Sequence, residues 1–146
     1  MANHASVLSI LSETEAMTLA TIGSSGDPRA TPVYFAFDDQ LNLIFISDRH
    51  SLHSRNLDRD ARAAVAIYPQ IDDWRALRGV QMQGRAREVE PSERGGAQAI
   101  YQRRFPFVAA FSELIGDSSF YRFVPAWVRW IDNRRGFGFQ QEWRLP

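Results

Sequence analysis

Residues 17–47 read MTLATIGSSGDPRATPVYFAFDDQLNLIFIS, a stretch in which three β-rich segments are separated by two short polar connections. Met17 to Ile22 is the first segment, and the turn formers Gly, Ser, Asp and Pro gather between Gly23 and Pro28. Arg29 to Phe37 then alternates, so that one face of the predicted strand carries Thr31, Val33, Phe35 and Phe37. The first two segments therefore predict a β-hairpin.

A second antiparallel connection follows the hairpin. Asp38-Asp39-Gln40 separates it from Leu41 to Ser47, an almost continuous apolar run that is typical of a buried strand. The polar, arginine-rich segment Asp48 to Asp60 comes next, and Ser51 is placed to cap a short helix that runs through Leu57.

Two further strands are predicted after this insertion. Ala63 to Tyr68 is short and apolar, whereas Arg78 to Val89 alternates between two kinds of side chain. One face of the longer segment carries Val80, Met82, Gly84 and Ala86, and the other carries Gln81, Gln83, Arg85 and Arg87. This alternation predicts a strand with one face buried and the other in water.

Apolar residues at helical spacing predict helices before and after these strands. The first helix contains Val7, Leu8, Ile10 and Leu11. The second covers Pro91 to Phe105, ends or bends at Pro106, and carries on one face Ala97, Ile100, Tyr101 and Arg104. We expect a further short helix over Phe107 to Leu114, and then two strands, Phe120 to Ile131 and Gly136 to Leu145, around the polar connection Asp132 to Arg135.

Together these elements give six or seven strands in meander order with a few peripheral helices. Strands this numerous tend to close into a barrel, because closure removes exposed edges. The predicted fold is therefore mainly β, a small antiparallel barrel. No internal repeat, linker or low-complexity tract divides the chain, so we expect a single domain over residues 1–146.

The charge composition excludes several classes of function. Seventeen basic residues balance seventeen acidic ones, which argues against a uniform field that would hold nucleic acid or a membrane surface. All of the basic residues counted are arginine, so Schiff-base chemistry, pyridoxal phosphate anchoring and a Walker-type lysine are excluded. Any bound anion must be held by arginine, histidine or backbone groups.

The common catalytic motifs are absent as well. Without cysteine, the chain has no thiol nucleophile, CxxC redox pair, iron–sulfur cluster or cysteine zinc site. His4, His50 and His53 form neither an HExxH motif nor a cluster with carboxylates at ligand spacing, so we expect no metal. GxSxG, GxGxxG and GxxxxGK[ST] are missing too, and the sequence names no catalytic residue.

The chain also lacks the segments that direct a protein to a membrane. No run approaches the ~20 apolar residues that span a bilayer. Met1 to Ser12 lacks the basic start and the long apolar run of a signal peptide. We therefore expect a cytoplasmic protein that does not bind membranes.

One segment remains as a candidate binding site, the end of the third strand and the start of the helix that follows it. A helix N-terminus offers free N–H groups and a partial positive charge, which suit a phosphate. Ser47 and Ser51 could add hydroxyl donors, and charge could come from Arg49, His53 or Arg55. The alternative is a capping serine followed by an ordinary solvated helix.

The order of these segments resembles the pyridoxamine 5'-phosphate oxidase-like superfamily of FMN-binding split barrels. The resemblance covers nearly the whole chain, from the hairpin Thr18 to Phe37, through the strand and cap Leu41 to Leu57, to Ala63 to Tyr68 and Gly79 to Gly84. Three motifs are similar to the short bacterial YhbP-type subfamily, RGVQMQG at 78–84, AIYQRRFP at 99–106 and IDNRRGFG at 131–138.

The resemblance implies a homodimer of six-stranded split barrels with two FMN molecules in clefts at the interface. The flavin ring would lie along Ala30, Thr31, Pro32 and Val33, and its phosphate at the hydroxyls of Ser47 and Ser51. The family often has Arg-Lys after the capping serine, where this chain has Leu52-His53, so Arg49 or Arg55 would have to compensate. Gln81 would replace a flavin-contacting glutamine that the family often places at the position of Gly79.

The aromatic content agrees with a dimer interface and a flavin cleft. An interface and a flavin cleft would use side chains beyond those of the core, with ordinary core packing as the alternative, and the candidates are Trp74, Trp127, Trp130, Phe137, Phe139 and Trp143.

The resemblance leaves two classes of function open. The first is an FMN-dependent oxidoreductase that acts on an unidentified small molecule, in which the cofactor supplies the reaction. The second is a non-catalytic module that holds FMN, haem or deazaflavin for sensing, storage or delivery. Vitamin B6 oxidation is not expected, because the C-terminal Arg-Leu-His substrate element of the true oxidases is missing.

Overall fold

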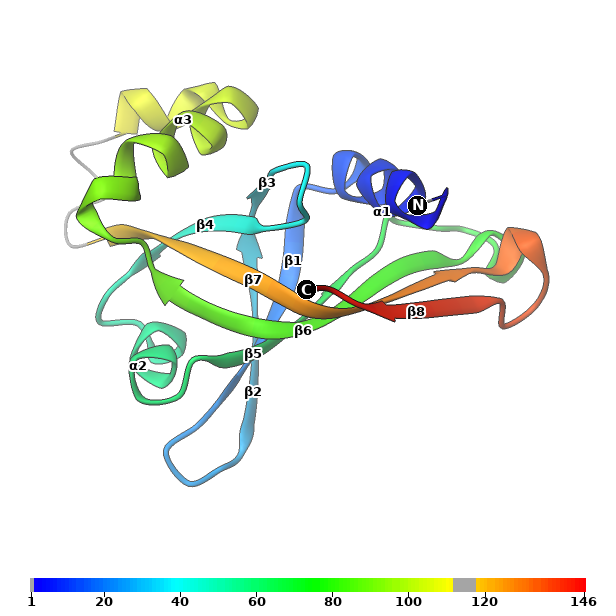
Figure 1. The fold of residues 1–146 in the computed structure, drawn as a ribbon, viewed down its shortest axis with the longest axis horizontal. Helices are drawn as coiled ribbons and strands as arrows, with labels where there is room; N and C mark the ends of the chain where they lie inside the picture. The colour runs from blue at the N-terminus through cyan, green and yellow to red at the C-terminus, as the bar shows by residue number, and fades with distance from the viewer. Residues whose placement is uncertain (1, 112–117) are drawn as a thin grey trace.

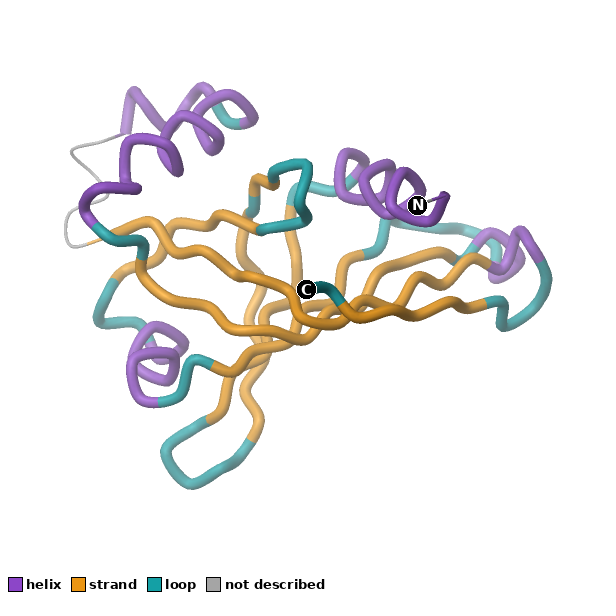
Figure 2. The backbone as a smooth tube through the Cα atoms, viewed as in Figure 1, coloured by secondary structure: helices purple, strands orange, loops and turns teal. Residues whose placement is uncertain are grey.

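β-Strands dominate the computed structural model, which describes residues 2–111 and 118–146. The strands are β1 Ala16–Ile22, β2 Pro28–Tyr34, β3 Ala36–Phe37, β4 Leu43–Asp48, β5 Arg62–Ile67, β6 Arg78–Glu88, β7 Ser118–Asp132 and β8 Gln140–Arg144. The helices are α1 Ala2–Glu13, α2 Leu52–Arg59 and α3 Arg94–Arg104, and short 3-10 helices cover Trp74–Ala76, Pro91–Glu93, Pro106–Phe111 and Asn133–Arg135. Figure 2 shows the strands in the middle of the molecule and the helices around them.

The predicted hairpin is confirmed as β1 and β2, which pair from Ala16 opposite Tyr34 to Ile22 opposite Pro28. The predicted strand Arg29 to Phe37 is divided, because Phe35 leaves the β1 ladder and only Ala36–Phe37 pairs with β4. The start of the predicted strand Leu41 to Ser47 belongs to the turn, where Leu41 has a φ of 67°. The part of the predicted helix Phe107 to Leu114 that covers 112–114 lies outside the described residues.

The strand order corrects the predicted meander. The eight-stranded sheet runs β2-β1-β5-β6-β7-β4-β3, with β8 on the other side of β7. Two of its pairings, β1 with β5 and β4 with β7, join strands that are distant in the sequence. Chain order alone could not give these pairings, because they depend on which strands bury their apolar faces together. The strand count exceeds six because β3 and β8 are separate short strands.

The sheet curls back on itself through Phe35. The strands at its two ends, β2 and β3, are consecutive in the chain and are joined by this one residue. The Phe35 ring is fully buried, and its backbone N–H donates to the carbonyl of Glu15 over 3.1 Å. An eight-stranded antiparallel sheet is thereby bent into a split barrel, as the sequence predicted.

The barrel interior holds the main core. It contains the alternate residues of the long strands that the sequence placed inward, among them Val80, Met82 and Ala86 of β6. α1 closes one end of this core with three apolar side chains, Val7, Ile10 and Leu11, which are all buried. The predicted first helix and its apolar face are thus confirmed.

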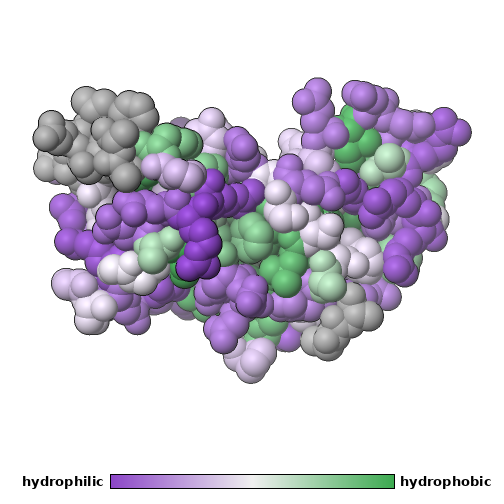
Figure 3. All heavy atoms as spheres, turned by 90° about the horizontal axis from the view of Figure 1, so that it is seen from above, coloured by the Kyte–Doolittle hydropathy of each residue, from purple (hydrophilic) through white to green (hydrophobic). Residues whose placement is uncertain are grey.

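A second, smaller core lies outside the barrel under α3. Ala97, Tyr101 and Phe105 pack against Ala36 and Ile44, on the other face of β3 and β4. Figure 1 shows α1 and α3 on the same side of the molecule. Figure 3, which looks onto this side, shows apolar surface gathered between hydrophilic margins.

A β-bulge in β7 bends the long β6–β7 ribbon, because Ala126 is an extra residue between the pairs Gln83–Trp127 and Gly84–Pro125. The register shifts between Gln83 and Gly84, where Gly84 lies opposite Pro125. A Cβ atom on Gly84 would lie 2.1 Å from the carbonyl oxygen of Val124, so only glycine fits without movement of the backbone. Within residues 2–111 and 118–146, no helix combines the length and the apolar character needed to cross a lipid bilayer.

Candidate functional site

The N-terminus of α2 carries the first candidate site. Ser51 caps the helix as the sequence predicted, because its Oγ accepts the backbone N–H of Ser54 over 3.3 Å. The same hydroxyl donates to the carbonyl of Asp48 over 2.8 Å. These bonds fold the chain from the end of β4 directly into the first turn of α2.

His53 joins the two predicted serines. Its Nε2 lies 2.7 Å from the Oγ of Ser47 and 3.3 Å from the Oγ of Ser51. Ser47 is buried at the end of β4, and burial of the imidazole lowers the pKa of His53 from its ordinary value. The three side chains therefore form a compact group of hydrogen-bonding atoms that is uncharged at neutral pH, which we call the Ser47–His53 cluster.

The two predicted arginines have other surroundings than the hydroxyls of this cluster. Arg49 donates through Nε to the Oε1 of Glu88 over 2.7 Å, so an acidic partner already neutralises its charge. Arg55 is exposed on α2. An anion at the cluster would consequently be bound mainly by the hydroxyls, the imidazole and backbone N–H groups, and less by either arginine.

α2 is held against β1 by contacts that the sequence analysis missed. The Nδ2 of Asn56 donates to the Oγ1 of Thr21 over 3.0 Å, and both side chains are buried. Arg59 donates to the Oδ1 of Asn56 over 2.9 Å and to the carbonyl of Ile22 over 2.8 Å. The sequence gives no signal of this docking, because an asparagine on a short polar helix is ordinarily exposed and its burial is visible only in the fold.

A second candidate site lies on the outside of the barrel. Residues directly opposite one another in an antiparallel pair point to the same face, so the register defines two rows across six strands. One row consists of Ala30, Ala20, Ala64, Gln83, Trp127 and Arg144, and the other of Pro32, Thr18, Ala66, Gln81, Arg129 and Glu142. We call these two rows the outer face.

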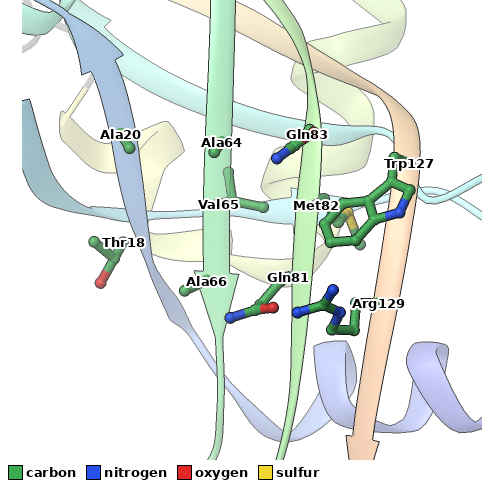
Figure 4. Close-up of a pocket in the computed structure, with 10 residues that line it drawn as sticks. All are labelled: Thr18, Ala20, Ala64, Val65, Ala66, Gln81, Met82, Gln83, Trp127 and Arg129. Atoms are coloured by element: carbon green, nitrogen blue, oxygen red, sulfur yellow. The ribbon is translucent and has the colours of Figure 1, made fainter. Parts of the chain in front are cut away.

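The outer face is hollowed in the middle because its central side chains are small. A hollow of about 450 Å³ is lined by residues of β1, β5, β6 and β7. Figure 4 shows the small side chains of Thr18, Ala20, Ala64 and Ala66 on one side of it, and the larger Gln81, Gln83, Trp127 and Arg129 on the other. Sequence analysis singled out Gln81 and Trp127 but missed the rest of this set, because it spans strands that are distant in the chain.

The predicted ring-binding strand divides between two faces. Ala30 and Pro32 lie on the outer face in line with Gln81, whereas Thr31 and Val33 lie opposite the buried Leu19 and Met17 and point inward. β2 pairs only with β1 in the described sheet, so its other edge retains free backbone groups. Along residues 30–33, a ligand could therefore contact all four residues only through the backbone at the unpaired edge of β2.

The exposed aromatic side chains are fewer than the composition suggested. Trp130 is buried, and Phe139 and Trp143 pack against the main core, so core packing accounts for these three. Trp74 and Phe137 remain exposed.

A protein-family model covers both sites. Residues 4–132 match the model described as pyridoxamine 5'-phosphate oxidase. The chain belongs to the pyridoxamine 5'-phosphate oxidase family. The match extends from α1 to the end of β7 and thus includes the Ser47–His53 cluster and most of the outer face.

Proteins of the YhbP type are similar to most of this chain. The chain is 25% identical over 123 residues to the UPF0306 protein YhbP of Escherichia coli O157:H7, an alignment that covers 84% of this chain and 80% of the relative. This similarity confirms the YhbP-type resemblance.

Solved structures with the same fold include proteins that bind different cofactors. A heme binding protein from Mycobacterium smegmatis superposes with a TM-score of 0.80 and 28% identity, over 98% of this chain and 57% of that chain. An FAD-binding protein from Mesorhizobium loti superposes with a TM-score of 0.68 and 17% identity, over 85% of this chain and 90% of that chain. The second likeness shows the fold alone.

The described residues offer no alternative metal centre. Within 2–111 and 118–146, no three histidine or carboxylate side chains lie close enough together to hold a metal ion. Within this family, the candidate sites of the chain are therefore the Ser47–His53 cluster and the outer face.

Proposed function

We propose that this protein binds FMN in a homodimer and uses it as an oxidoreductase on a small molecule that is still unidentified. The observation that carries the proposal is the Ser47–His53 cluster, where two hydroxyls and an imidazole meet within 3.3 Å at the start of α2. The match to the oxidase family over residues 4–132 supports the same reading.

The donor set of the cluster fits a phosphate group. Serine hydroxyls and the free N–H groups of a helix N-terminus donate to phosphate oxygens, and the helix dipole favours negative charge there. His53 can donate from a protonated ring once an anion approaches, because a neighbouring negative charge raises the pKa of an imidazole. Ser47 and His53 would hold the phosphate, Ser51 would join them by turning its hydroxyl hydrogen away from the Asp48 carbonyl, and Arg55 would add a longer-range charge.

The remaining predicted residues fit a flat ring system. β2 offers the backbone of Ala30, Thr31, Pro32 and Val33 along its free edge, and backbone N–H and carbonyl groups can hydrogen-bond the polar rim of a flavin. Gln81 would reach this ring from the outer face, either in the same chain or from a partner.

The outer face is the surface that we assign to the homodimer. An uncharged part of a sheet face is normally covered by another layer. The middle of the outer face is such a part, because it carries alanine and threonine. Small side chains allow a second sheet to approach closely, and Trp127 and Arg129 at the border are residue types enriched in interfaces.

FMN when bound would supply hydride or electron transfer. The protein would orient it, exclude water from part of the ring and hold the phosphate. His53 is the titratable side chain of the cluster, and because it lies beside the two serine hydroxyls, this proposal gives it a role in phosphate binding rather than at the reacting ring. No side chain of the cluster is therefore assigned a catalytic role.

Haem is the second candidate ligand. The partly buried imidazole of His53 has a lowered pKa and is neutral, which is the form that binds haem iron. The heme binding protein that shares 28% identity with this chain supports this candidate. It differs from the first in using His53 as a metal ligand instead of a phosphate donor.

A ligand titration tests the proposal. The visible spectrum of the purified protein is recorded before and after addition of FMN or haemin, and the FMN affinity is measured by quenching of flavin fluorescence. We expect Ser51→Ala/His53→Ala to weaken FMN binding at least tenfold, about 1.4 kcal/mol. The control His4→Ala/Ser92→Ala removes the same two residue types outside the cluster and should bind normally.

The outcomes separate the candidates. Normal FMN binding by Ser51→Ala/His53→Ala would refute the phosphate site while leaving the cofactor in place. A wild-type protein that ignores FMN and gives a haem Soret band lost in His53→Ala would establish the second candidate instead.

A further inference from the structure

The AIYQRRFP motif at residues 99–106 forms the last turns of α3 and the turn that follows the helix. Tyr101 and Phe105 of this motif belong to the smaller core. Three other side chains of the motif, Ile100, Arg103 and Arg104, line a surface hollow of about 310 Å³, which we call the α1–α3 groove. The lining of the groove is completed by Ser12, Ala36 and Phe37. The motif therefore builds a concave surface as well as part of a core.

Arg104 is fixed at the side of the groove by two kinds of contact. Its Nη2 donates to the carbonyl of Leu11 over 2.9 Å and also to the carbonyl of Thr14. These carbonyls lie at the C-terminal end of α1, where the helix dipole favours a cation. The guanidinium carbon also lies 4.8 Å from the centre of the Phe35 ring and 5.0 Å from that of Phe37. The cation is thus held in place by the fold itself.

The charge of Arg104 is only partly balanced. The acceptors of its Nη2 are neutral carbonyl groups, and its Nη1 is buried without a hydrogen-bond partner within residues 2–111 and 118–146. Burial lowers the pKa of Arg104, and the negative charge of the exposed Glu15 acts in the opposite direction. An arginine stays protonated in proteins. The groove therefore keeps a positive charge that one solvent-screened carboxylate balances incompletely.

Arg103 adds a second positive charge to the groove. It belongs to the last turn of α3, and its side chain is exposed. Among the described residues, none of the ion pairs includes Arg103 or Arg104. Two neighbouring like charges repel each other, and an anion between them relieves the repulsion. A guanidinium also binds a carboxylate through two parallel hydrogen bonds, so the groove favours an organic anion over a neutral molecule.

The rest of the groove is mainly apolar. Ala36 and Phe37 contribute to it from β3, and Ile100 from α3. Phe37 and Ile100 are partly exposed, so they retain apolar surface for a ligand. Figure 3 looks onto this side of the molecule and shows apolar surface between hydrophilic margins. Small-molecule sites range from about 300 to 1,000 Å³, so the groove suits a compact ligand.

The groove is separate from the Ser47–His53 cluster. Ala36 pairs with Ile44 of β4, and Ile44 packs in the smaller core under α3. Ser47 lies three residues further along β4, so its side chain points to the opposite face of the strand. A ligand in the groove would therefore lie on the other face of β4 from a phosphate at the cluster.

We propose that the α1–α3 groove binds a small aromatic acid, a carboxylate joined to a compact apolar ring. The exposed Arg103 makes the direct contact with the carboxylate. Arg104 contributes charge, because its Nη2 is already bonded to the end of α1. Phe37 and Ile100 contact the ring of the ligand. This site does not depend on FMN, so its failure would leave the proposed function unchanged.

Cinnamate is the probe, because it joins a carboxylate to a flat apolar ring. Its binding is followed by the amide chemical shifts of the isotope-labelled full chain in NMR spectra. We expect saturable shifts at Phe37, Ile100 and Arg103. Cinnamamide has the same shape without the charge and should bind about tenfold more weakly. Arg103→Met keeps the side-chain stem without the charge and should weaken cinnamate binding by a similar factor of about ten.

The matched control is Arg94→Met. Arg94 is exposed in the first turn of the same helix and does not line the groove, so this variant should bind cinnamate as the wild type does. Arg103→Lys keeps the charge without the two parallel hydrogen bonds and should recover part of the affinity. Circular dichroism checks that each variant is folded.

Three results would overturn the proposal. Shifts that fail to saturate, or that map away from the groove, would show that the groove is not the site. Equal binding of cinnamate and cinnamamide would remove the role of the carboxylate. Equal losses of affinity in Arg94→Met and Arg103→Met would show that only the overall charge of the protein matters.

Discussion

The buried pair Asn56 and Thr21 makes a quantitative prediction about how α2 is held in place. Thr21→Val replaces the hydroxyl by a methyl group of similar shape, so the Nδ2 of Asn56 loses the acceptor 3.0 Å away. Asn56 is 1% exposed, and water cannot take over this bond. An unsatisfied buried polar group costs about 1–3 kcal/mol, so we expect the free energy of unfolding to fall by about 2 kcal/mol.

The partner substitution Asn56→Ala has a similar expected cost. It leaves the Thr21 hydroxyl without its donor and creates a small cavity, again about 2 kcal/mol. The double variant removes both polar groups and therefore leaves neither one unsatisfied. Its cost should be smaller than the sum of the two single costs by about 1–2 kcal/mol.

Equilibrium urea unfolding followed by tryptophan fluorescence measures all four proteins. For a chain of this size, a loss of 2 kcal/mol corresponds to a decrease of about 6–8 °C in the midpoint of thermal unfolding. If the cost of the double variant equalled the sum of the two single costs to within about 0.5 kcal/mol, the reasoning would be refuted, because residues that do not interact give additive costs. Since α2 carries Ser51 and His53, Asn56→Ala should also weaken FMN binding.

Two further predictions concern the bulge and the histidine. Gly84→Ala should lower the free energy of unfolding by at least about 1–3 kcal/mol, because its Cβ would meet the Val124 carbonyl at 2.1 Å. Gly95→Ala in α3, where a Cβ meets nothing within 4 Å, should instead be stabilising by about 0.5–1 kcal/mol, and chemical denaturation of both variants checks this contrast. Because burial lowers the pKa of His53, the unfolded chain binds its proton more readily, so the free protein should lose stability as pH falls below about 6.5, the ordinary histidine pKa. A bound phosphate favours the protonated imidazole, so the FMN affinity should rise as pH falls from 8 to 6.5, by at most about tenfold per pH unit. If the variant His53→Gln kept this pH dependence, the proposed role of His53 in phosphate binding would be contradicted.

The local features of the molecule could be predicted from the sequence. The β1–β2 hairpin follows from a cluster of turn formers between two β-rich segments, and the cap at Ser51 depends only on the next three residues. The inward and outward faces of β6 follow from an alternation of period two. Even the Ser47–His53 contact joins residues only six apart, across a strand end and a helix cap.

The arrangement in space was decided by tertiary structure. The pairings of β1 with β5 and of β4 with β7 depend on which apolar faces are buried together, and no spacing within one segment encodes such a choice. These pairings bring Ala20, Ala64 and Gln83 into one row and so create the outer face. They also place Thr21 under Asn56, 35 residues away. The sequence by itself determined the strands, the cap and the residue types that we propose for phosphate binding, whereas the hollow required the folded chain, because it is built from strands that meet only when the sheet forms.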